Sequence, residues 1–241
     1  MKYLFFDIEN ATSKDRQYRI CEFGYVQTYE NYSLIKRDNL IIDPKIREDE
    51  WDKVVLGRVL TRKMSEYLGN KTLKDYYEQI SKLISESDYV FGFDPAGDIA
   101  SLNVDCNRYG LKAICCNVYD TKKLYEYAIG EKCNLGLAKI VEKENVKCDE
   151  KDHDAGTDAL NTKELLKVIL NKKAETLECV LSNCKDSKLI NDEKRFEEDV
   201  RKKSKKERKE EKNYKSREVR GLSVGDLLKA QIDLNKIDIK D

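Results

Sequence analysis

Apolar residues in the first part of the chain repeat with the periods of strands and helices in alternation. The run Tyr3–Glu9 is mostly apolar and predicts a buried central strand. Two segments rich in Ile, Val, Tyr and Leu, 20–29 and 33–43, meet at Asn31-Tyr32 and predict an antiparallel hairpin. Apolar residues at helical spacing over 72–86 then predict a helix.

The alternation continues to residue 172. Short strands are predicted at 89–91 and 114–118, and helices at 95–109, 121–128, 135–144 and 155–171. Three strands followed by alternating helices and strands predict an α/β fold with a mixed β-sheet flanked by helices.

Charge separates the end of the chain from this region. The chain has 46 basic and 46 acidic residues, yet residues 201–220 hold 11 Lys and Arg against 4 Glu. Large apolar residues nearly vanish there, which predicts a solvated helix or a disordered linker. We therefore expect a domain at 1–172, a charged helical or disordered linker at 173–220 and a short amphipathic segment at 221–241. A boundary near 190 is the alternative, if one more helix packs on the domain.

Composition excludes several classes of protein. The eight cysteines include no Cys-x-x-Cys pair, and one histidine cannot complete a Cys/His zinc ribbon, so reduced thiols are expected. No apolar stretch approaches the ~18 residues of a membrane span. The apolar start meets Asp7 too soon for a signal peptide. These features predict a cytoplasmic protein without a membrane partner.

Two carboxylates interrupt the first strand. Asp7 and Glu9, at i and i+2, project from one face of a strand whose other residues call for burial. Burying both unpaired would cost several kcal/mol or force protonation, and a hard divalent cation such as Mg²⁺ or Mn²⁺ removes that cost. The alternative is that the strand ends near Phe6 and leaves both exposed.

A third acidic residue stands near the start of the helix predicted at 95–109. Asp94 before Pro95 has the pattern of an N-cap followed by a first helical residue. Asp98 then falls on the first turn, where it is either a metal ligand or an acid favoured by the helix dipole.

The last pair of residues lies at the start of the helix predicted at 155–171. Asp158 points along the face formed by Ala155, Ala159 and Thr162, where an ionised carboxylate requires a metal or another cation. His153, the chain's one histidine, precedes a candidate cap at Asp152 or Asp154. It is either a surface or core residue or, with an unperturbed pKa of about 6.5, a general base.

Together these residues resemble the DnaQ-like (DEDDh) 3′–5′ exonuclease superfamily, over roughly residues 1–172. Phe5-Phe6-Asp7-Ile8-Glu9 resembles the family's Asp-x-Glu motif on the first strand. Asp98 stands where the second motif has an aspartate at a helix start, and His153 with Asp158 matches the third motif. Asn10 departs from the threonine often found there, and Phe93-Asp94 from the usual His-Asn. These departures bear on how the terminal nucleotide is gripped.

The resemblance implies a ribonuclease H-like fold and an enzyme, a two-metal-ion phosphodiester hydrolase. Asp7, Glu9, Asp98 and Asp158 would hold two divalent cations, Mg²⁺ or Mn²⁺, and His153 would deprotonate the attacking water. The activity implied is release of nucleoside 5′-monophosphates from the 3′ end of single-stranded nucleic acid, with DNA of a proofreading or repair type favoured. The alternatives are an RNA 3′ exonuclease or oligoribonuclease, and an inactive nucleic-acid-binding or scaffold module.

Two features of the last 41 residues leave alternatives open. The basic run at 201–220 either contacts phosphates or is a solvated helix of mixed charge. Gln231-Ile232-Asp233-Leu234 resembles the peptide by which bacterial replication proteins dock on the sliding clamp. The same residues also suit an amphipathic helix packed through Leu227, Leu228 and Ile232.

Overall fold

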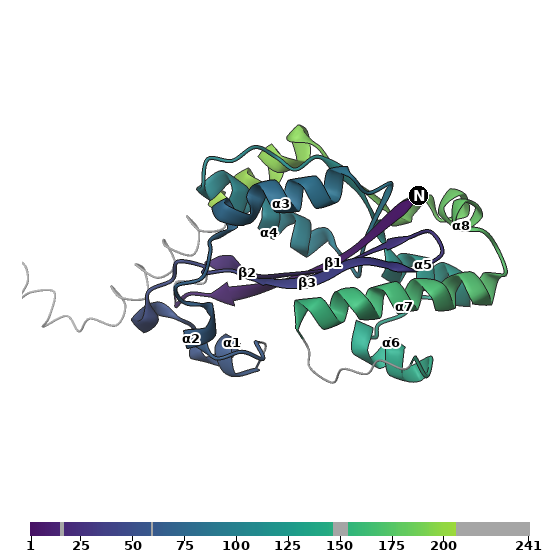
Figure 1. Ribbon diagram of the computed structural model, residues 1–241, viewed down its shortest axis with the longest axis horizontal. Helices are drawn as coiled ribbons and strands as arrows, with labels where there is room; N and C mark the ends of the chain where they lie inside the picture. The colour runs from purple at the N-terminus through teal and green to yellow at the C-terminus, as the bar shows by residue number, and fades with distance from the viewer. Residues whose placement is uncertain (15–16, 59, 147–153, 206–241) are drawn as a thin grey trace, which may run out of the picture. The chain divides into compact units, whose positions relative to one another are not determined.

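The computed structural model describes residues 1–14, 17–58, 60–146 and 154–205 (Figure 1). Met1–Val200 form one compact unit and Arg201–Asp241 a second. The sheet and the helices α1 to α8 belong to the first unit.

A six-stranded mixed sheet forms the centre of this unit, with the strand order β3-β2-β1-β4-β5-β6. The strands are β1 (Lys2–Thr12), β2 (Tyr18–Tyr29), β3 (Leu34–Ile41), β4 (Tyr89–Gly92), β5 (Cys116–Asp120) and β6 (Lys188–Asn191). β1, β2 and β3 pair antiparallel, β4 and β5 follow parallel to β1, and β6 closes the sheet antiparallel to β5. The predicted hairpin and mixed sheet are confirmed.

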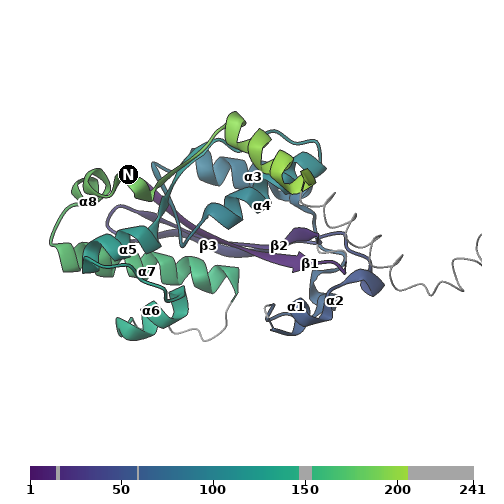
Figure 2. The same cartoon turned by 180° about the vertical axis from the view of Figure 1, so that it is seen from behind.

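Helices cover both faces of the sheet, as Figures 1 and 2 show from opposite sides. One face packs against α3 (Leu73–Ser85) and α4 (Ala96–Arg108). The other packs against α5 (Thr121–Ile129), α6 (Leu137–Lys143), α7 (Ala155–Lys173) and α8 (Leu177–Asn183). All five helices predicted within residues 72–171 are present, with ends that differ by a few residues.

The alternation of side chains along β1 divides the strand between the two cores. Leu4, Phe6 and Ile8 are buried in the core under α3 and α4, whereas Tyr3 and Phe5 are buried in the core under α7. Because side chains alternate along a strand, Asp7 and Glu9 continue the row of Tyr3 and Phe5 on the α7 side. β1 runs on to Thr12, so the alternative that it ends near Phe6 is wrong.

A third, smaller core lies between the sheet and a segment for which the sequence predicted no elements. This segment contains η1 (Glu48–Glu50), α1 (Lys53–Arg58) and α2 (Met64–Tyr67). Its buried residues are Ala11, Cys21, Ile46, Trp51, Leu60 and Tyr67. The Trp51 ring nitrogen donates a hydrogen bond of 3.1 Å to the Ile46 carbonyl oxygen, which fixes the indole inside this core.

The compact unit extends past residue 172, where the sequence analysis placed the end of the domain. η2 (Lys185–Ser187) leads into β6, which pairs with β5, and a helix begins at 193. Asn103 of α4 and Asn191 of β6 are both buried and exchange hydrogen bonds of 2.8 and 3.2 Å. This attachment is polar, so the apolar periodicity of the sequence does not show it.

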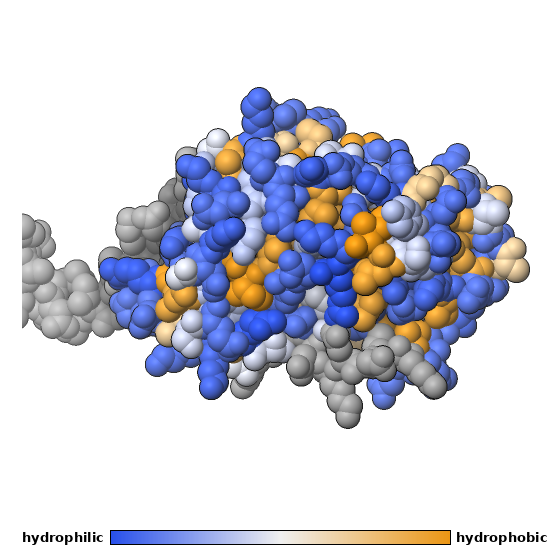
Figure 3. All heavy atoms as spheres, viewed as in Figure 1, coloured by the Kyte–Doolittle hydropathy of each residue, from blue (hydrophilic) through white to orange (hydrophobic). Residues whose placement is uncertain are grey.

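The outer surface is mainly hydrophilic, with separate hydrophobic patches, on the face shown in Figure 3. Exposed large apolar side chains include Tyr29, Leu34 and Val54. Among the described helices, none has the length and apolar character needed to cross a bilayer. Seven cysteines lie within the described residues, and all seven are free thiols.

Candidate metal centre

Three of the carboxylates singled out in the sequence meet on the α7 side of the sheet. Asp7 and Glu9 of β1 and Asp158 of α7 each offer an oxygen, and these ligand atoms all lie within 4.8 Å of one another. All three residues are partly buried. The predicted proximity of Asp7, Glu9 and Asp158 is therefore present in the fold.

A close contact between α7 and the sheet brings Asp158 to the strand. Asp7 is paired across the sheet with Gly24 of β2, and α7 begins directly against that glycine. A Cβ atom at Gly24 would lie 2.0 Å from the Ala155 carbonyl carbon, so no other residue fits there without moving the helix. Asp158 stands in the first turn of α7 and thus reaches the same row as Asp7.

The start of α7 is fixed by its own cap. Asp154 is the N-cap residue, and its side chain accepts a hydrogen bond of 2.8 Å from the Thr157 amide. The Asp158 amide donates a bond of 2.9 Å to the Asp154 carbonyl oxygen. Of the two cap candidates in the sequence, Asp154 is the one that caps the helix.

Asp98 is not one of the three carboxylates whose ligand oxygens lie within 4.8 Å of one another; it lies in the first turn of α4. β4 runs parallel to β1, and α4 follows it, so the first turn of α4 lies near the carboxyl half of β1. The negative charge of Asp98 is the largest charge contribution that raises the pKa of Asp7. The charge of Asp98 also contributes to the raised pKa of Glu9.

The predicted N-cap at Asp94 is wrong. Pro95 takes the N-cap position of α4, without a side-chain cap bond. Asp94 adopts a left-handed conformation with φ 51°, and its carboxylate lies 3.4 Å from the Lys122 ammonium. Its own amide donates instead to the Asp120 side chain at 3.0 Å. The chain thus turns sharply between β4 and α4 before Asp98.

The electrostatics of the cluster favour a bound cation. Burial first, and then the charges of Asp98, Asp158, Glu9 and Glu22, raise the pKa of Asp7 well above its usual range. Burial and the Glu22 charge raise the pKa of Glu9 to about 8. Burial and the Asp94 charge raise the pKa of Asp98 to about 7. The fold therefore holds carboxylates together against their mutual repulsion.

This donor set fits a hard divalent cation. Carboxylate oxygens are the ligands that Mg²⁺ and Mn²⁺ prefer, and a divalent charge replaces the protons that the raised pKa values would otherwise require. The fit rests on the three oxygens that lie within 4.8 Å of one another.

Three predicted features lie wholly or partly outside the described residues. His153 immediately precedes Asp154 in the sequence but is not itself described. The same holds for the possible clamp-binding residues Gln231–Leu234 and for the part of the basic run that follows residue 205.

Sequence reasoning missed two charged residues beside the cluster, Glu22 and Arg62. Glu22 is paired with Glu9 across the sheet and is only 1% exposed. It carried the same signal as Asp7, a carboxylate inside an apolar strand, Ile20-Cys21-Glu22-Phe23. Arg62 carried no such signal, because it lies in an irregular segment between α1 and α2.

The chain matches no protein-family model and no curated protein sequence. It is similar to the nuclease domain of 3′hExo, a DEDDh family member bound to rAMP, with a TM-score of 0.60 and 14% identity over 80% of this chain and 96% of that one. It is similar to Exonuclease I of E. coli in complex with a dA16 oligonucleotide, with a TM-score of 0.56 and 15% identity over 76% of this chain and 42% of that one. Pop2p of S. pombe, in a form with bound Mg²⁺ and Mn²⁺, gives a TM-score of 0.54 and 16% identity over 70% of this chain and 82% of that one.

These likenesses define the class of fold. The chain has the α/β, ribonuclease H-like fold that DnaQ-like 3′-exonucleases share, as the motifs predicted. At 14–16% identity, the fold is what these structures establish for this chain.

Proposed function

We propose that this protein is a metal-dependent 3′–5′ exonuclease that releases nucleoside 5′-monophosphates from single-stranded nucleic acid. The observation that carries the proposal is the meeting of Asp7, Glu9 and Asp158, with ligand oxygens within 4.8 Å of one another. A buried cluster of like charges has a cost in stability, and the binding of divalent cations is a chemical reason for its presence.

In this proposal Asp7, Glu9, Asp98 and Asp158 are the ligands of two divalent cations. When bound, Mg²⁺ or Mn²⁺ would acidify and orient the attacking water and stabilise the charge on the leaving 3′-oxygen. His153 would take the proton from that water while the water oxygen forms a bond to the phosphorus of the last phosphodiester. The bond from phosphorus to the 3′-oxygen breaks, and that oxygen then takes a proton from solvent.

DNA is the favoured substrate in this proposal, and RNA is the alternative within the same chemistry. The similar structures support both, since one holds a deoxyoligonucleotide and another a ribonucleotide. In this proposal the cluster acts on the phosphate and the attacking water, not on the sugar, so it would not discriminate between the two substrates. We further propose that the protein acts in proofreading or repair in the cytoplasm. The basic run at 201–220 would contact phosphates of the substrate.

The test is a cleavage assay on 5′-labelled single-stranded DNA and RNA of equal sequence, with Mg²⁺, Mn²⁺ or EDTA. We expect a metal-dependent ladder that shortens from the 3′ end and is absent for Asp158→Ala. The stronger of the two ladders identifies the preferred sugar. If the wild-type protein cleaves neither strand with either metal, the proposal fails and the inactive binding module replaces it.

His153→Ala tests the general base separately from the metal ligands. We expect turnover to fall by about 10²–10⁴-fold, while calorimetric titration with Mn²⁺ remains close to wild type because the carboxylates are unchanged. Asp7→Ala is the matched comparison and should lose both turnover and Mn²⁺ binding. Wild-type turnover in His153→Ala would remove His153 from the mechanism.

A further inference from the structure

Glu22 is a buried carboxylate that connects several elements around the candidate metal centre. Its side chain is 1% exposed, and it is paired with Glu9 across the neighbouring strands β2 and β1. Its oxygens accept hydrogen bonds of 2.7 Å from the Tyr67 hydroxyl of α2 and 2.7 Å from the Asn39 amide of β3. The Ala155 amide at the start of α7 donates to it as well, at 3.4 Å.

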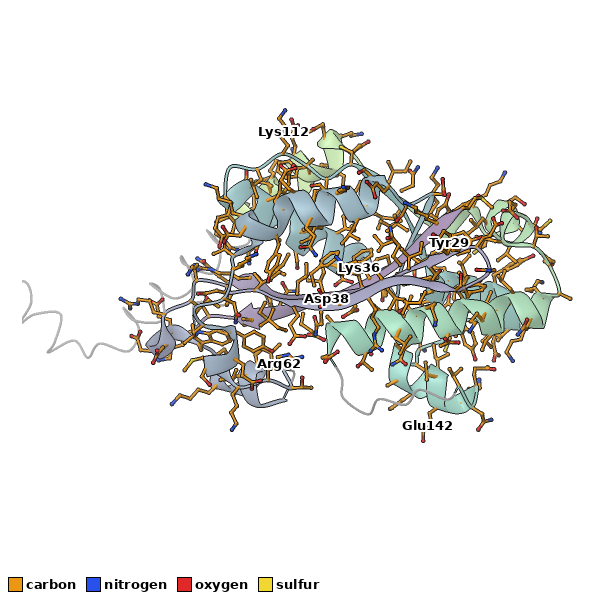
Figure 4. All side chains as sticks on the ribbon, in the orientation of Figure 1. Tyr29, Lys36, Asp38, Arg62, Lys112 and Glu142 are labelled. Carbon is orange, nitrogen blue, oxygen red and sulfur yellow. The ribbon has the colours of Figure 1, made fainter. Side chains whose placement is uncertain are left out.

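Arg62 joins this buried acid to the cap of α7. Its Nε lies 3.4 Å from a Glu22 oxygen, and its Nη2 donates to the Asp154 side chain at 3.3 Å. In Figure 4 the labelled Arg62 lies between the segment that carries α1 and α2 and the first turn of α7. One guanidinium therefore contacts a carboxylate of β2 and a carboxylate of α7 at once.

From these contacts we propose that Arg62 is a positioning residue, which with Glu22 and Asp154 fixes the start of α7, and hence Asp158, against the strand of Asp7 and Glu9. The inference rests on the proposed nuclease function. It assigns a role in the reaction to the segment of α1 and α2, which carries none of the proposed metal ligands.

The physical reason is the geometry of the guanidinium. Arg presents several N–H donors in a rigid planar fork, so it can hold two carboxylates of different elements in one arrangement. Asp158 follows Asp154 by one helical turn, so a shift of the cap carries the ligand with it. Partners in the outer shell of metal ligands typically change metal affinity or activity by about 10–100-fold.

The test compares Arg62→Ala, Arg62→Lys and Asp154→Asn with the wild-type full-length chain. Arg62→Ala should lower kcat by about 10–100-fold and weaken Mn²⁺ binding by about tenfold, with little change in KM. Hydrogen exchange should speed up at the amides of Ala155 and Thr157 but not in β1. Arg62→Lys should give intermediate values, because a single ammonium cannot contact both acids in a fork.

Asp154→Asn keeps a good N-cap for the Thr157 amide but loses the charge that faces Arg62. It should change kcat in the same direction as Arg62→Ala, and the double variant should be no worse than Arg62→Ala alone. Arg47→Ala is the matched control. Arg47 also contacts two acids, Asp49 and Glu50, but is 72% exposed, and this variant should equal wild type in every measurement.

Several outcomes would overturn the inference. Wild-type kcat and wild-type exchange at the start of α7 in Arg62→Ala would do so. A raised KM with unchanged kcat would place Arg62 on the substrate instead, and additive losses in the double variant would separate it from Asp154. If Arg62→Ala does not fold, Asp154→Asn alone decides. Failure of the wild-type protein to cleave any strand would refute the proposed function, whereas the exchange result would still report on the contact.

Discussion

At the scale of single residues, the carboxylates of the candidate metal centre lower the stability of the metal-free fold. Asp7, Glu9 and Asp98 are carboxylates whose pKa values are raised, because burial and neighbouring charges disfavour the ionised form. Such groups lower the free energy of unfolding once the pH exceeds their ordinary pKa, because the unfolded chain then releases a proton that the folded protein retains. On stability alone, apolar residues would be favoured at these positions.

Neutralising Asp7, one of the proposed ligands, should therefore stabilise the metal-free protein. We expect Asp7→Asn to raise the free energy of unfolding at about pH 8, because burial and the neighbouring charges that raise the pKa of Asp7 do not penalise a neutral amide. The same variant should lose metal-dependent cleavage. Urea unfolding in EDTA measures the first effect. Asp49→Asn, at a side chain that is 75% exposed, is the control and should change stability by less than about 0.5 kcal/mol.

The pH dependence of stability has a definite sign. The pKa of Glu9 rises from 4.5 to about 8, and that of Asp98 from 3.8 to about 7. Between the ordinary and the raised values the folded state holds protons that the unfolded state releases, so stability falls as pH rises through this window. In EDTA we expect the Tm to fall between about pH 5 and about pH 8, and Mg²⁺ to remove most of that fall by replacing the protons. A metal-free Tm that stays level or rises over the window would contradict the assigned pKa values.

At the scale of elements, the site depends on how closely α7 approaches β2. The approach requires a residue without a side chain at Gly24, because a Cβ there would overlap the backbone of Ala155 and Gly156. The first turn of α7 is thus positioned by contact between two backbones, which leaves little freedom for Asp158.

Gly24→Ala should damage stability and activity together. The added methyl group must push α7 away from the sheet, and such overpacking typically costs about 1–3 kcal/mol. We expect a fall of that size in the free energy of unfolding and a loss of Mn²⁺ affinity. Gly57→Ala in α1 is the matched control, because nothing lies within 4 Å of its added Cβ. Equal behaviour of the two variants would argue against the close contact.

The elements that the sequence predicted are those with a local signal. β1 and α3 bury regular apolar faces, and Asp7 and Glu9 are visible as exceptions to such a face. The segment of α1 and α2 has short elements that pack on a small core of their own. It therefore has no long apolar repeat from which its helices could be predicted. Contacts such as that of Arg62 with Asp154 join residues far apart in the sequence, and only the tertiary fold brings them together.

At the scale of the whole molecule, two cores on opposite faces of one sheet hold in place the three elements that carry the proposed metal ligands, β1, α4 and α7. The last strand, β6, belongs to this arrangement, because the side-chain amide of Asn191 also donates a hydrogen bond of 2.8 Å to the Ile114 carbonyl oxygen beside β5. The Asn103 amide reaches Asp199 as well, at 3.0 Å. These contacts tie the chain around residues 188–199 to α4, which carries Asp98.

Truncation should reveal this dependence. A chain that ends at residue 172 lacks β6 and leaves Asn103 of α4 without its buried partners, which costs about 1–3 kcal/mol for each unsatisfied group. We expect this chain to unfold at markedly lower urea concentration than one that ends at residue 205. If the chain that ends at residue 205 binds nucleic acid more weakly than the full-length chain at low salt, residues 206–241 contribute to binding. Equal unfolding midpoints for the two truncations would contradict a structural role for β6.

The order of the ligands along the chain has a consequence for protein synthesis. Asp7 and Glu9 leave the ribosome early, Asp98 later, and Asp158 only after most of the sheet has been made. Because the oxygens gather only when α7 lies on β2, a growing chain carries an incomplete site. The proposed nuclease site is therefore incomplete until Asp158 has been synthesised and α7 has packed on β2.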